Sequence, residues 1–306
     1  MYNEHFKIRE APFSLTPDTE YYYNFKSHQE ALNVLNVALE SGEGIIKIIG
    51  EVGTGKTLLC RKMMNALAEK HQVFYIPNPL LDTVALYQSL TEALGIRIFL
   101  NMTLLDMTGK MTEALSALSK EGKKFIVCID EAQALPRESL EALRLLSNLE
   151  TEKQKLLQII LFAQPELDKV LEGNDLRQIR QRISFSYYLQ ALDRSAVAAY
   201  INYRLYVAGY TDGSLFDDAA VEAIYRSSRG IPRLVNTLCH KAMMVAYGMG
   251  LKTVELPQVM MASRDTEEAT PLSSFNLGSL SSYYYPIGIF VLLGMAIVVA
   301  RLWSAS

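Results

Sequence analysis

Residues 50–57 of this 306-residue chain read Gly-Glu-Val-Gly-Thr-Gly-Lys-Thr, a glycine-rich run that ends in Lys56 and Thr57. Backbone N–H groups in such a loop can surround a phosphate group, because glycine lets the chain turn tightly around it. An apolar run at 45–49 precedes the loop and a helix-like run at 58–67 follows it, which is the context that this pattern requires. The sequence therefore predicts a phosphate-binding loop between a strand and a helix.

Two side chains of this loop have the chemistry to bind ATP or ADP together with Mg²⁺. Lys56 can reach the β- and γ-phosphates, and the Thr57 hydroxyl can coordinate Mg²⁺. The positive end of the following helix adds to the attraction for phosphate. The residues expected to contact the nucleotide are the loop and the residue after it: Gly50, Glu51, Val52, Gly53, Thr54, Gly55, Lys56, Thr57 and Leu58.

A pair of acidic residues ends another apolar run. Residues 124–129 are apolar after the first, and Asp130 and Glu131 follow them directly. Asp130 is expected in the Mg²⁺ coordination shell, and Glu131 is expected to orient or deprotonate the attacking water. Acidic residues also mark solvated strand ends, but a position downstream of a phosphate loop favours a nucleotide hydrolase site.

Hydrolysis also requires positive charge where the γ-phosphate reacts. Arg233 follows Pro232 in the run Gly-Ile-Pro-Arg-Leu-Val-Asn at 230–236, and proline suits the first turn of a helix. An arginine at the start of such a helix can fold back over the phosphates, although a plain surface role is the alternative. Gln164 follows the apolar run 156–163 and could sense the γ-phosphate.

A short helix is expected directly before the apolar run 183–189, and it holds three arginines: Arg177, Arg180 and Arg182. We predict that Arg182 meets the γ-phosphate of a neighbouring subunit, with Arg180 as the reserve. A solvated basic helix face is the alternative. Asn78 could hold Glu131 away from water until a partner arrives, or it could simply form a turn.

The elements that position these residues alternate between strands and helices up to residue 192. Strands are expected at 45–49, 73–76, 124–129, 156–163 and 183–189, and helices at 28–39, 58–67, 82–94, 103–119 and 137–149. This alternation predicts an α/β fold with a parallel sheet and with ligands at the carboxyl ends of the strands. Beyond residue 192, four helices are expected, at 194–207, 217–228, 232–247 and 256–263.

The predicted organisation has five parts: an N-terminal arm at 1–26, a nucleotide-binding domain at 27–192, a small all-α lid at 193–263, a linker at 264–282 and a transmembrane helix at 283–303. The last part is long enough to cross a membrane, because 21 helical residues span about 30 Å. Residues 269–300 carry no charge, and three tyrosines and Trp303 flank the apolar part as an aromatic belt would. A buried terminal helix is the alternative, but this stretch is apolar on all sides.

Composition narrows the functional classes. Half of the residues are apolar and the net charge is −3 without a Lys/Arg block, so nucleic acid is not expected as the main partner. Cys60, Cys128 and Cys239 lack metal-type spacing. Two of them, Cys60 and Cys128, lie in apolar runs next to the nucleotide motifs and are expected to be buried thiols in a reducing compartment. The first residues are polar and mixed in charge, so we expect no signal peptide.

Taken together, these motifs resemble those of the AAA+ ATPases, a family of P-loop NTPases. Three places carry a narrower resemblance to the ExeA/GspA group, and within it to the MSHA pilus biogenesis ATPases: Tyr2, His5-Phe6 and 12–18 in the arm, the run 50–57, and Gln-Pro-Glu-Leu at 164–167. The resemblance covers residues 1–263. It implies a homo-oligomeric ATPase at the inner membrane, with its catalytic domain on the cytoplasmic side. Its implied partners are inner-membrane assembly proteins of a type IV-like (MSHA) pilus or a type II secretion apparatus.

Two other functions remain open. A nucleotide-gated scaffold would bind ATP and scarcely hydrolyse it, and the sequence does not exclude this because Glu131 can be kept idle. A DNA-handling ATPase of the transposition type shares the same core. It would have a basic face and no membrane span, and the sequence predicts the reverse of both.

Overall fold

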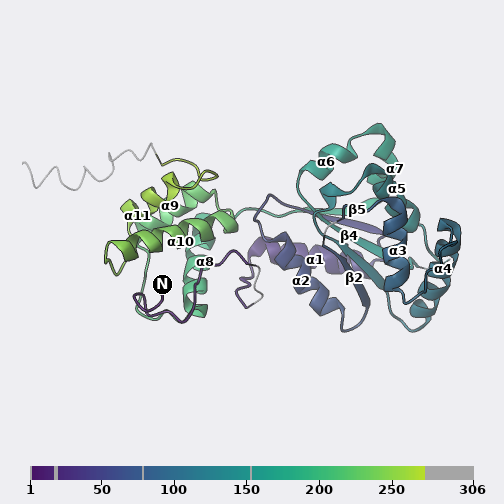
Figure 1. The fold of residues 1–306 in the computed structure, drawn as a ribbon, viewed down its shortest axis with the longest axis horizontal. Coiled ribbons are helices and arrows are strands. Elements are labelled where there is room, and N and C mark those ends of the chain that lie inside the picture. The colour runs from purple at the N-terminus through teal and green to yellow at the C-terminus, as the bar shows by residue number, and fades with distance from the viewer. Residues whose placement is uncertain (1, 17–19, 78, 152–153, 273–306) are drawn as a thin grey trace, which may run out of the picture.

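The computed structural model describes residues 2–16, 20–77, 79–151 and 154–272, which form an α/β domain and a helical lid (Figure 1). The predicted transmembrane helix at 283–303, the second half of the predicted linker, and Asn78 lie outside the described residues. Within the described part of the chain, none of the helices has both the length and the apolar character needed to span a bilayer.

Five parallel strands form one sheet in the order β2-β3-β4-β1-β5. The strands are β1 (Ile45–Ile49), β2 (Gln72–Ile76), β3 (Phe125–Ile129), β4 (Leu157–Ala163) and β5 (Ile183–Tyr188). The central strands β3 and β4 are buried at every residue, as their continuous apolar sequences predict. The edge strand β5 alternates between half-buried and exposed residues. The predicted parallel α/β sheet is therefore confirmed.

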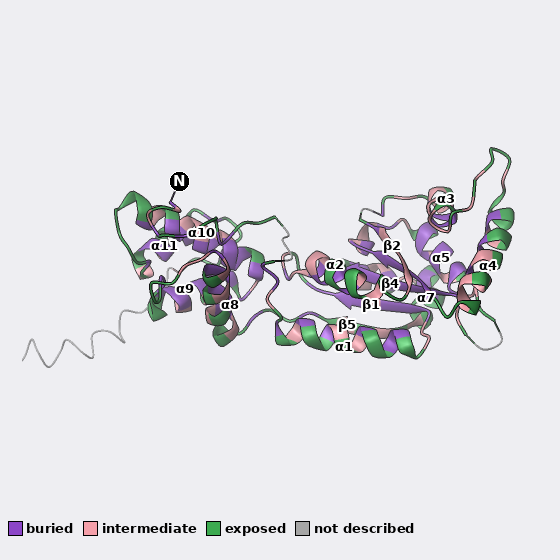
Figure 2. Ribbon diagram, turned by 90° about the horizontal axis from the view of Figure 1, so that it is seen from below, coloured by how far each residue is buried: buried purple, intermediate pink, exposed green. Residues whose placement is uncertain are grey.

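Helices cover both faces of the sheet (Figure 1). One face carries α1 (Lys26–Glu40) and α2 (Lys56–Leu67), which pack on Ile46 and Ile48. The other face contacts Ile45 and Ile49 and carries α3 (Thr83–Ala93), α4 (Leu104–Lys120) and α5 (Arg137–Leu146). Shorter elements follow β3 and β4: η1 (Ala132–Ala134), α6 (Glu166–Leu171), η2 (Asn174–Leu176) and α7 (Arg177–Arg182). Figure 2 shows that the buried residues gather on the sheet and on the inward sides of these helices.

The lid consists of α8 (Arg194–Val207), α9 (Asp218–Ser228), α10 (Pro232–Gly248) and α11 (Leu256–Arg264). Asp193 and Asp217 cap the first two helices, because each carboxylate accepts a hydrogen bond from a backbone N–H of the first turn. Residues beyond α11 also pack on the lid: Ala269 is buried, and the Thr270 N–H donates to the Ser227 carbonyl at 2.9 Å. The described part of the predicted linker is therefore held against the lid.

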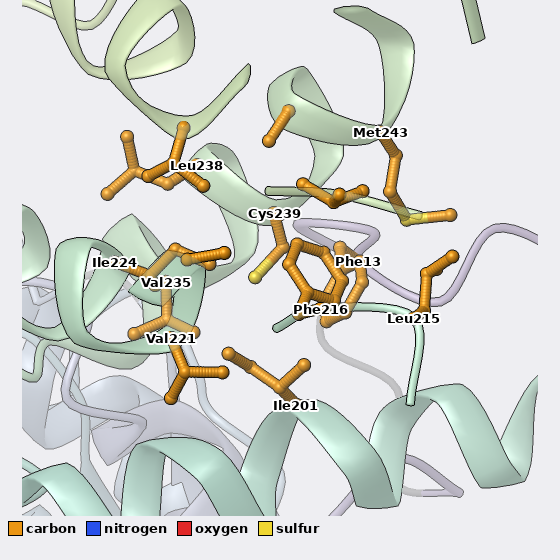
Figure 3. Packing of buried hydrophobic residues seen from close by; sticks show 14 of the residues in the cluster. Phe13, Ile201, Leu215, Phe216, Val221, Ile224, Val235, Leu238, Cys239 and Met243 are labelled. Atoms are coloured by element: carbon orange, nitrogen blue, oxygen red, sulfur yellow. The ribbon is translucent and has the colours of Figure 1, made fainter. Parts of the chain in front are cut away.

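The N-terminal arm forms part of the lid core. The aromatic and aliphatic residues of the arm in this core are Tyr2, Phe6, Ile8, Phe13 and Phe25. The Phe13 ring meets Phe216 edge-on, with centroids 6.0 Å apart, among residues of α8, α9 and α10 (Figure 3). The buried Arg204 guanidinium of α8 donates to the Pro12 carbonyl at 2.5 Å and lies 4.6 Å from the Tyr21 ring. The arm therefore anchors the lid rather than extending freely.

Phe13→Ala should destabilise the protein by about 3–5 kcal/mol, because the ring is 2% exposed and its removal leaves a cavity between arm and lid. Val37→Ala, on the exposed face of α1, is the control and should change stability by less than about 0.5 kcal/mol. Urea unfolding followed by circular dichroism measures both. Equal unfolding midpoints for the two variants would show that the arm does not hold the lid.

Candidate functional site

The loop between β1 and α2 places a lysine where phosphate would bind. Gly53 and Gly55 have φ values of 82° and 92°, in the left-handed region that favours glycine. Lys56 is 5% exposed, and its ammonium group donates to the carbonyls of Gly50 at 2.8 Å and Glu51 at 3.1 Å. Burial lowers the pKa of Lys56, and nearby carboxylates oppose this shift. The ammonium is thus held inside the loop.

A hydroxyl and a carboxylate meet beside this loop. The Thr57 hydroxyl at the start of α2 donates to Oδ2 of Asp130 at 2.6 Å, and Tyr75 donates to the same oxygen at 3.3 Å. No cluster of three His, Cys, Asp or Glu side chains suited to a metal ion occurs among the described residues. A Mg²⁺ ion that keeps waters and nucleotide oxygens needs only one or two protein oxygens. The Thr57 and Asp130 oxygens fit that requirement.

The second acidic residue is fixed by two glutamine side chains. Oε2 of Glu131 accepts hydrogen bonds from Nε2 of Gln133 at 2.6 Å and from Nε2 of Gln164 at 2.8 Å. The structure therefore brings Glu131 and Gln164 together, as expected for two residues at the carboxyl ends of neighbouring strands. The sequence analysis did not identify Gln133 as a site residue. Its position two residues after Glu131 was the one feature of the sequence that pointed to it.

The lid begins directly on the phosphate loop. The Arg233 N–H at the first turn of α10 donates to the Gly53 carbonyl at 3.2 Å. A Cβ atom on Gly53 would lie 2.5 Å from the Cβ of Arg233, so only glycine permits this approach. Pro232 occupies the first helical turn as its sequence context predicts. The structure thus places Arg233 at the loop, with its side chain exposed.

A cavity of about 370 Å³ extends from this loop between the α/β domain and the lid. Its lining comes from the loop and Leu58, from Glu131, from the arm at Tyr21, Tyr23 and Phe25, and from the lid at Tyr200, Arg204, Arg233 and Asn236. Aromatic side chains of this kind give apolar surface that suits a planar ring. The cavity therefore combines a polar end at the phosphate loop with an aromatic end between arm and lid.

Two residues that line this cavity each carry a buried acceptor without a hydrogen-bond partner among the described residues. Nε2 of His28 donates to the Thr54 carbonyl at 3.0 Å, because a carbonyl oxygen can only accept. Burial lowers the pKa of His28, so its ring is neutral at pH 7 and its unpaired Nδ1 is an acceptor. Oδ1 of Asn236 is also buried and unpaired. Both residues line the cavity.

The three arginines of α7 do not join this site. The start of β5 pairs with the start of β1, Ile183 with Ile45. Since α7 leads into the start of β5, it lies near the amino ends of the strands, whereas the phosphate loop follows the carboxyl end of β1. The side chain of Arg182 is exposed there and does not line the cavity. It cannot act on the nucleotide of its own chain, and its action on a neighbouring subunit stays a prediction.

Comparisons with known proteins agree with this geometry. Residues 39–171 match the family model described as an AAA domain. The chain also resembles the solved structures of Cdc6p from Pyrobaculum aerophilum, at a TM-score of 0.62, and of the ORC2 protein from Aeropyrum pernix, at 0.58. Each is 18% identical; the matches cover 83% and 87% of this chain and 70% and 74% of those chains. The chain has an α/β AAA+ P-loop fold. This likeness to solved structures establishes the fold alone.

The chain is also similar to a protein that is named for a secretion pathway. General secretion pathway protein A of Aeromonas hydrophila is 35% identical over 303 residues, which are 99% of this chain and 53% of that protein. The chain thus spans about half the length of this relative. The similarity extends beyond the nucleotide-binding domain and supports the ExeA/GspA group that the sequence motifs indicated.

Lys56→Ala should weaken ATP binding at least about tenfold, since a charge-assisted hydrogen bond contributes ~1.5–3 kcal/mol. Lys62→Ala is the matched control, because Lys62 lies on the same helix and its ammonium is over the Tyr22 ring outside the main cavity. Titration with a fluorescent ATP analogue measures both. Unchanged affinity of Lys56→Ala would remove Lys56 from the site.

Proposed function

We propose that the protein binds ATP with Mg²⁺ and hydrolyses it. The observation that carries this proposal is the 2.6 Å hydrogen bond between Thr57, at the end of the phosphate loop, and Asp130, at the end of β3. These residues lie 73 positions apart in the sequence. Their contact joins the phosphate loop to a buried acidic strand end, which is the arrangement that nucleotide hydrolysis requires.

Each residue of the site has a role in this proposal. Thr57 and Asp130 would hold Mg²⁺, which neutralises charge on the phosphates when bound. Lys56 would leave its loop carbonyls for the β- and γ-phosphates. Glu131 would accept a proton from the attacking water or orient it, while Gln164 and Arg233 would stabilise charge on the γ-phosphate.

The aromatic end of the cavity supports adenine as the base. The exocyclic amino group of adenine can donate two hydrogen bonds, and two residues of the lining carry unpaired acceptors, Nδ1 of His28 and Oδ1 of Asn236, which a shift of these side chains on binding would turn toward the base. An unpaired buried acceptor costs about 1–3 kcal/mol, so pairing it with a donor favours binding. A base that presents a carbonyl oxygen at that place would leave these acceptors unpaired.

We further propose a cellular setting. The protein would act as a membrane-anchored homo-oligomer on the cytoplasmic side of the inner membrane, like the MSHA pilus biogenesis ATPase MshM. It would support assembly of a type IV-like pilus or a type II secretion apparatus, and Arg182 would act on the neighbouring subunit. This proposal is supported by the secretion-pathway relative and by the apolar sequence at 283–303.

A nucleotide-gated scaffold with little turnover is the second candidate. One observation favours it: both donors on the Glu131 carboxylate come from protein side chains, so the group is already engaged before any water is placed. Turnover by the purified protein, with and without membranes, distinguishes a scaffold from an enzyme.

Glu131→Gln should bind ATP with near wild-type affinity and lower turnover by about 100-fold or more, because a general base contributes about 10²–10⁴-fold. Phosphate release measures turnover, and chelation of Mg²⁺ with EDTA should abolish it in the wild-type protein. Glu138→Gln, on the exposed first turn of α5, is the control and should remain active. Near wild-type turnover of Glu131→Gln would mean that another residue activates the water.

Asn236→Leu should reduce discrimination between ATP and inosine triphosphate, which carries a carbonyl oxygen where adenine carries its amino group. We expect the wild-type protein to favour ATP by about tenfold, roughly the free energy of one buried hydrogen bond. Asn148→Leu is the control, because Oδ1 of Asn148 is also buried and unpaired but lies outside the cavity. Equal affinities for the two nucleotides in the wild-type protein would rule out recognition of the adenine amino group.

A further inference from the structure

The side chain of Gln133 links the catalytic carboxylate to the end of the neighbouring strand. Its Nε2 donates to Oε2 of Glu131 at 2.6 Å, and its Oε1 accepts from the Gln164 N–H at 3.0 Å. We propose that Gln133 is a positioning residue that sets the orientation of Glu131 relative to the γ-phosphate. The inference rests on the proposed ATP hydrolysis.

The backbone turn after β3 makes this contact possible. Glu131 has φ 51° and ψ 39°, a left-handed conformation that is unusual for a residue other than glycine. The helical turn η1 follows, and the Ala134 N–H donates to the Glu131 carbonyl at 2.9 Å. This tight turn directs Gln133 back onto the side chain two residues before it. Such a strained conformation persists only where its surroundings hold it in place.

The hydrogen bonds fix the amide of Gln133 in one orientation. The Gln164 N–H needs an acceptor, so Oε1 of Gln133 must face it. Nε2 then faces Glu131, where a carboxylate can only accept. Nε2 of Gln164 donates to the same oxygen at 2.8 Å, which closes a cycle of three hydrogen bonds. No alternative orientation of this amide satisfies both neighbours.

The cycle leaves one carboxylate oxygen for chemistry. Both amide donors converge on Oε2 of Glu131, and Oε1 makes no hydrogen bond within the described part of the chain. Gln164 has a second amide hydrogen that can face the γ-phosphate, because each amide nitrogen carries two. Gln133 therefore holds the carboxylate by Oε2 at the strand end that would meet the phosphate, and this leaves Oε1 for the water. An orientation error of about 1 Å at such a group can cost about 100-fold in rate.

The test is Gln133→Met, which keeps the volume of the side chain and removes its amide. We expect the turnover number to fall by about tenfold, the scale seen when hydrogen bonds that orient a functional ligand are removed. The KM and the affinity for ATP should stay within about twofold, because Gln133 does not line the cavity. Gln154→Met is the matched control, since Gln154 is exposed and bonds Ser119 away from the site.

A double-mutant cycle separates positioning from general damage. If Gln133 acts through Glu131, adding Gln133→Met to Glu131→Gln should change the residual turnover by less than about twofold. An equal loss in both backgrounds, or wild-type turnover of Gln133→Met, would overturn the inference. So would a loss of ATP affinity in place of turnover.

A second readout does not depend on turnover. Residues in direct contact give non-additive changes in stability, so the Tm values of the same four proteins should show coupling between Gln133 and Glu131. Additive Tm changes would refute the contact. A wild-type protein that binds ATP, shows the coupling and never hydrolyses ATP would instead contradict the proposed hydrolysis, and with it the catalytic role of the contact.

Discussion

The hydrogen bond between Thr57 and Asp130 depends on the register of three parallel strands. β4 lies between β1 and β3 and pairs with both, Ala163 with Ile49 and Leu161 with Ile129. The carboxyl ends of all three strands therefore lie on the same side of the sheet. The phosphate loop, Gln164 and the acidic pair follow the ends of β1, β4 and β3, so they lie in a row in that order. A slip of the β4 register would separate the hydroxyl from the carboxylate and would also move Gln164 away from Glu131.

The lid completes the site through close backbone approaches. Besides Gly53, Gly230 marks such a point: its φ is 72°, and a Cβ atom there would lie 1.9 Å from the Leu192 carbonyl oxygen. Leu192 lies between β5 and α8 and packs in the lid core, so this contact sets where the lid starts. The arm adds a second connection, because it packs in the lid core, lines the cavity and then enters α1 at Phe25. A nucleotide in the cavity would contact both connections, so its binding and the position of the lid are physically linked.

Local sequence predicted the sheet, the longer helices and the phosphate-binding elements, because each depends on neighbouring residues. The short helix α6 (Glu166–Leu171) was not predicted. Element ends shifted by a few residues; the helix expected at 137–149 ends at Leu146, where Ser147 turns the chain toward β4. The packing of the arm was not predictable, since its aromatic residues have no regular period and their partners lie about 200 residues away, as Phe13 and Phe216 do. The contact of Gln133 with Glu131 depends on the left-handed backbone conformation of Glu131, which no sequence pattern predicts.

The polar side chains that would bind the nucleotide and Mg²⁺ already form hydrogen bonds within the protein. Lys56 is bonded to two loop carbonyls, Thr57 to Asp130, and Glu131 to two amides. Binding must exchange the Lys56 and Thr57 contacts for phosphate and metal, so affinity measures a difference between two satisfied states. Lys56 gains from the exchange, because phosphate carries full charge and a carbonyl does not. Glu131 gains little, since its amide donors are retained on Oε2 and only Oε1 is left to meet a water. The structure therefore separates tight binding, which depends on Lys56, from turnover, which depends on how Glu131 is held.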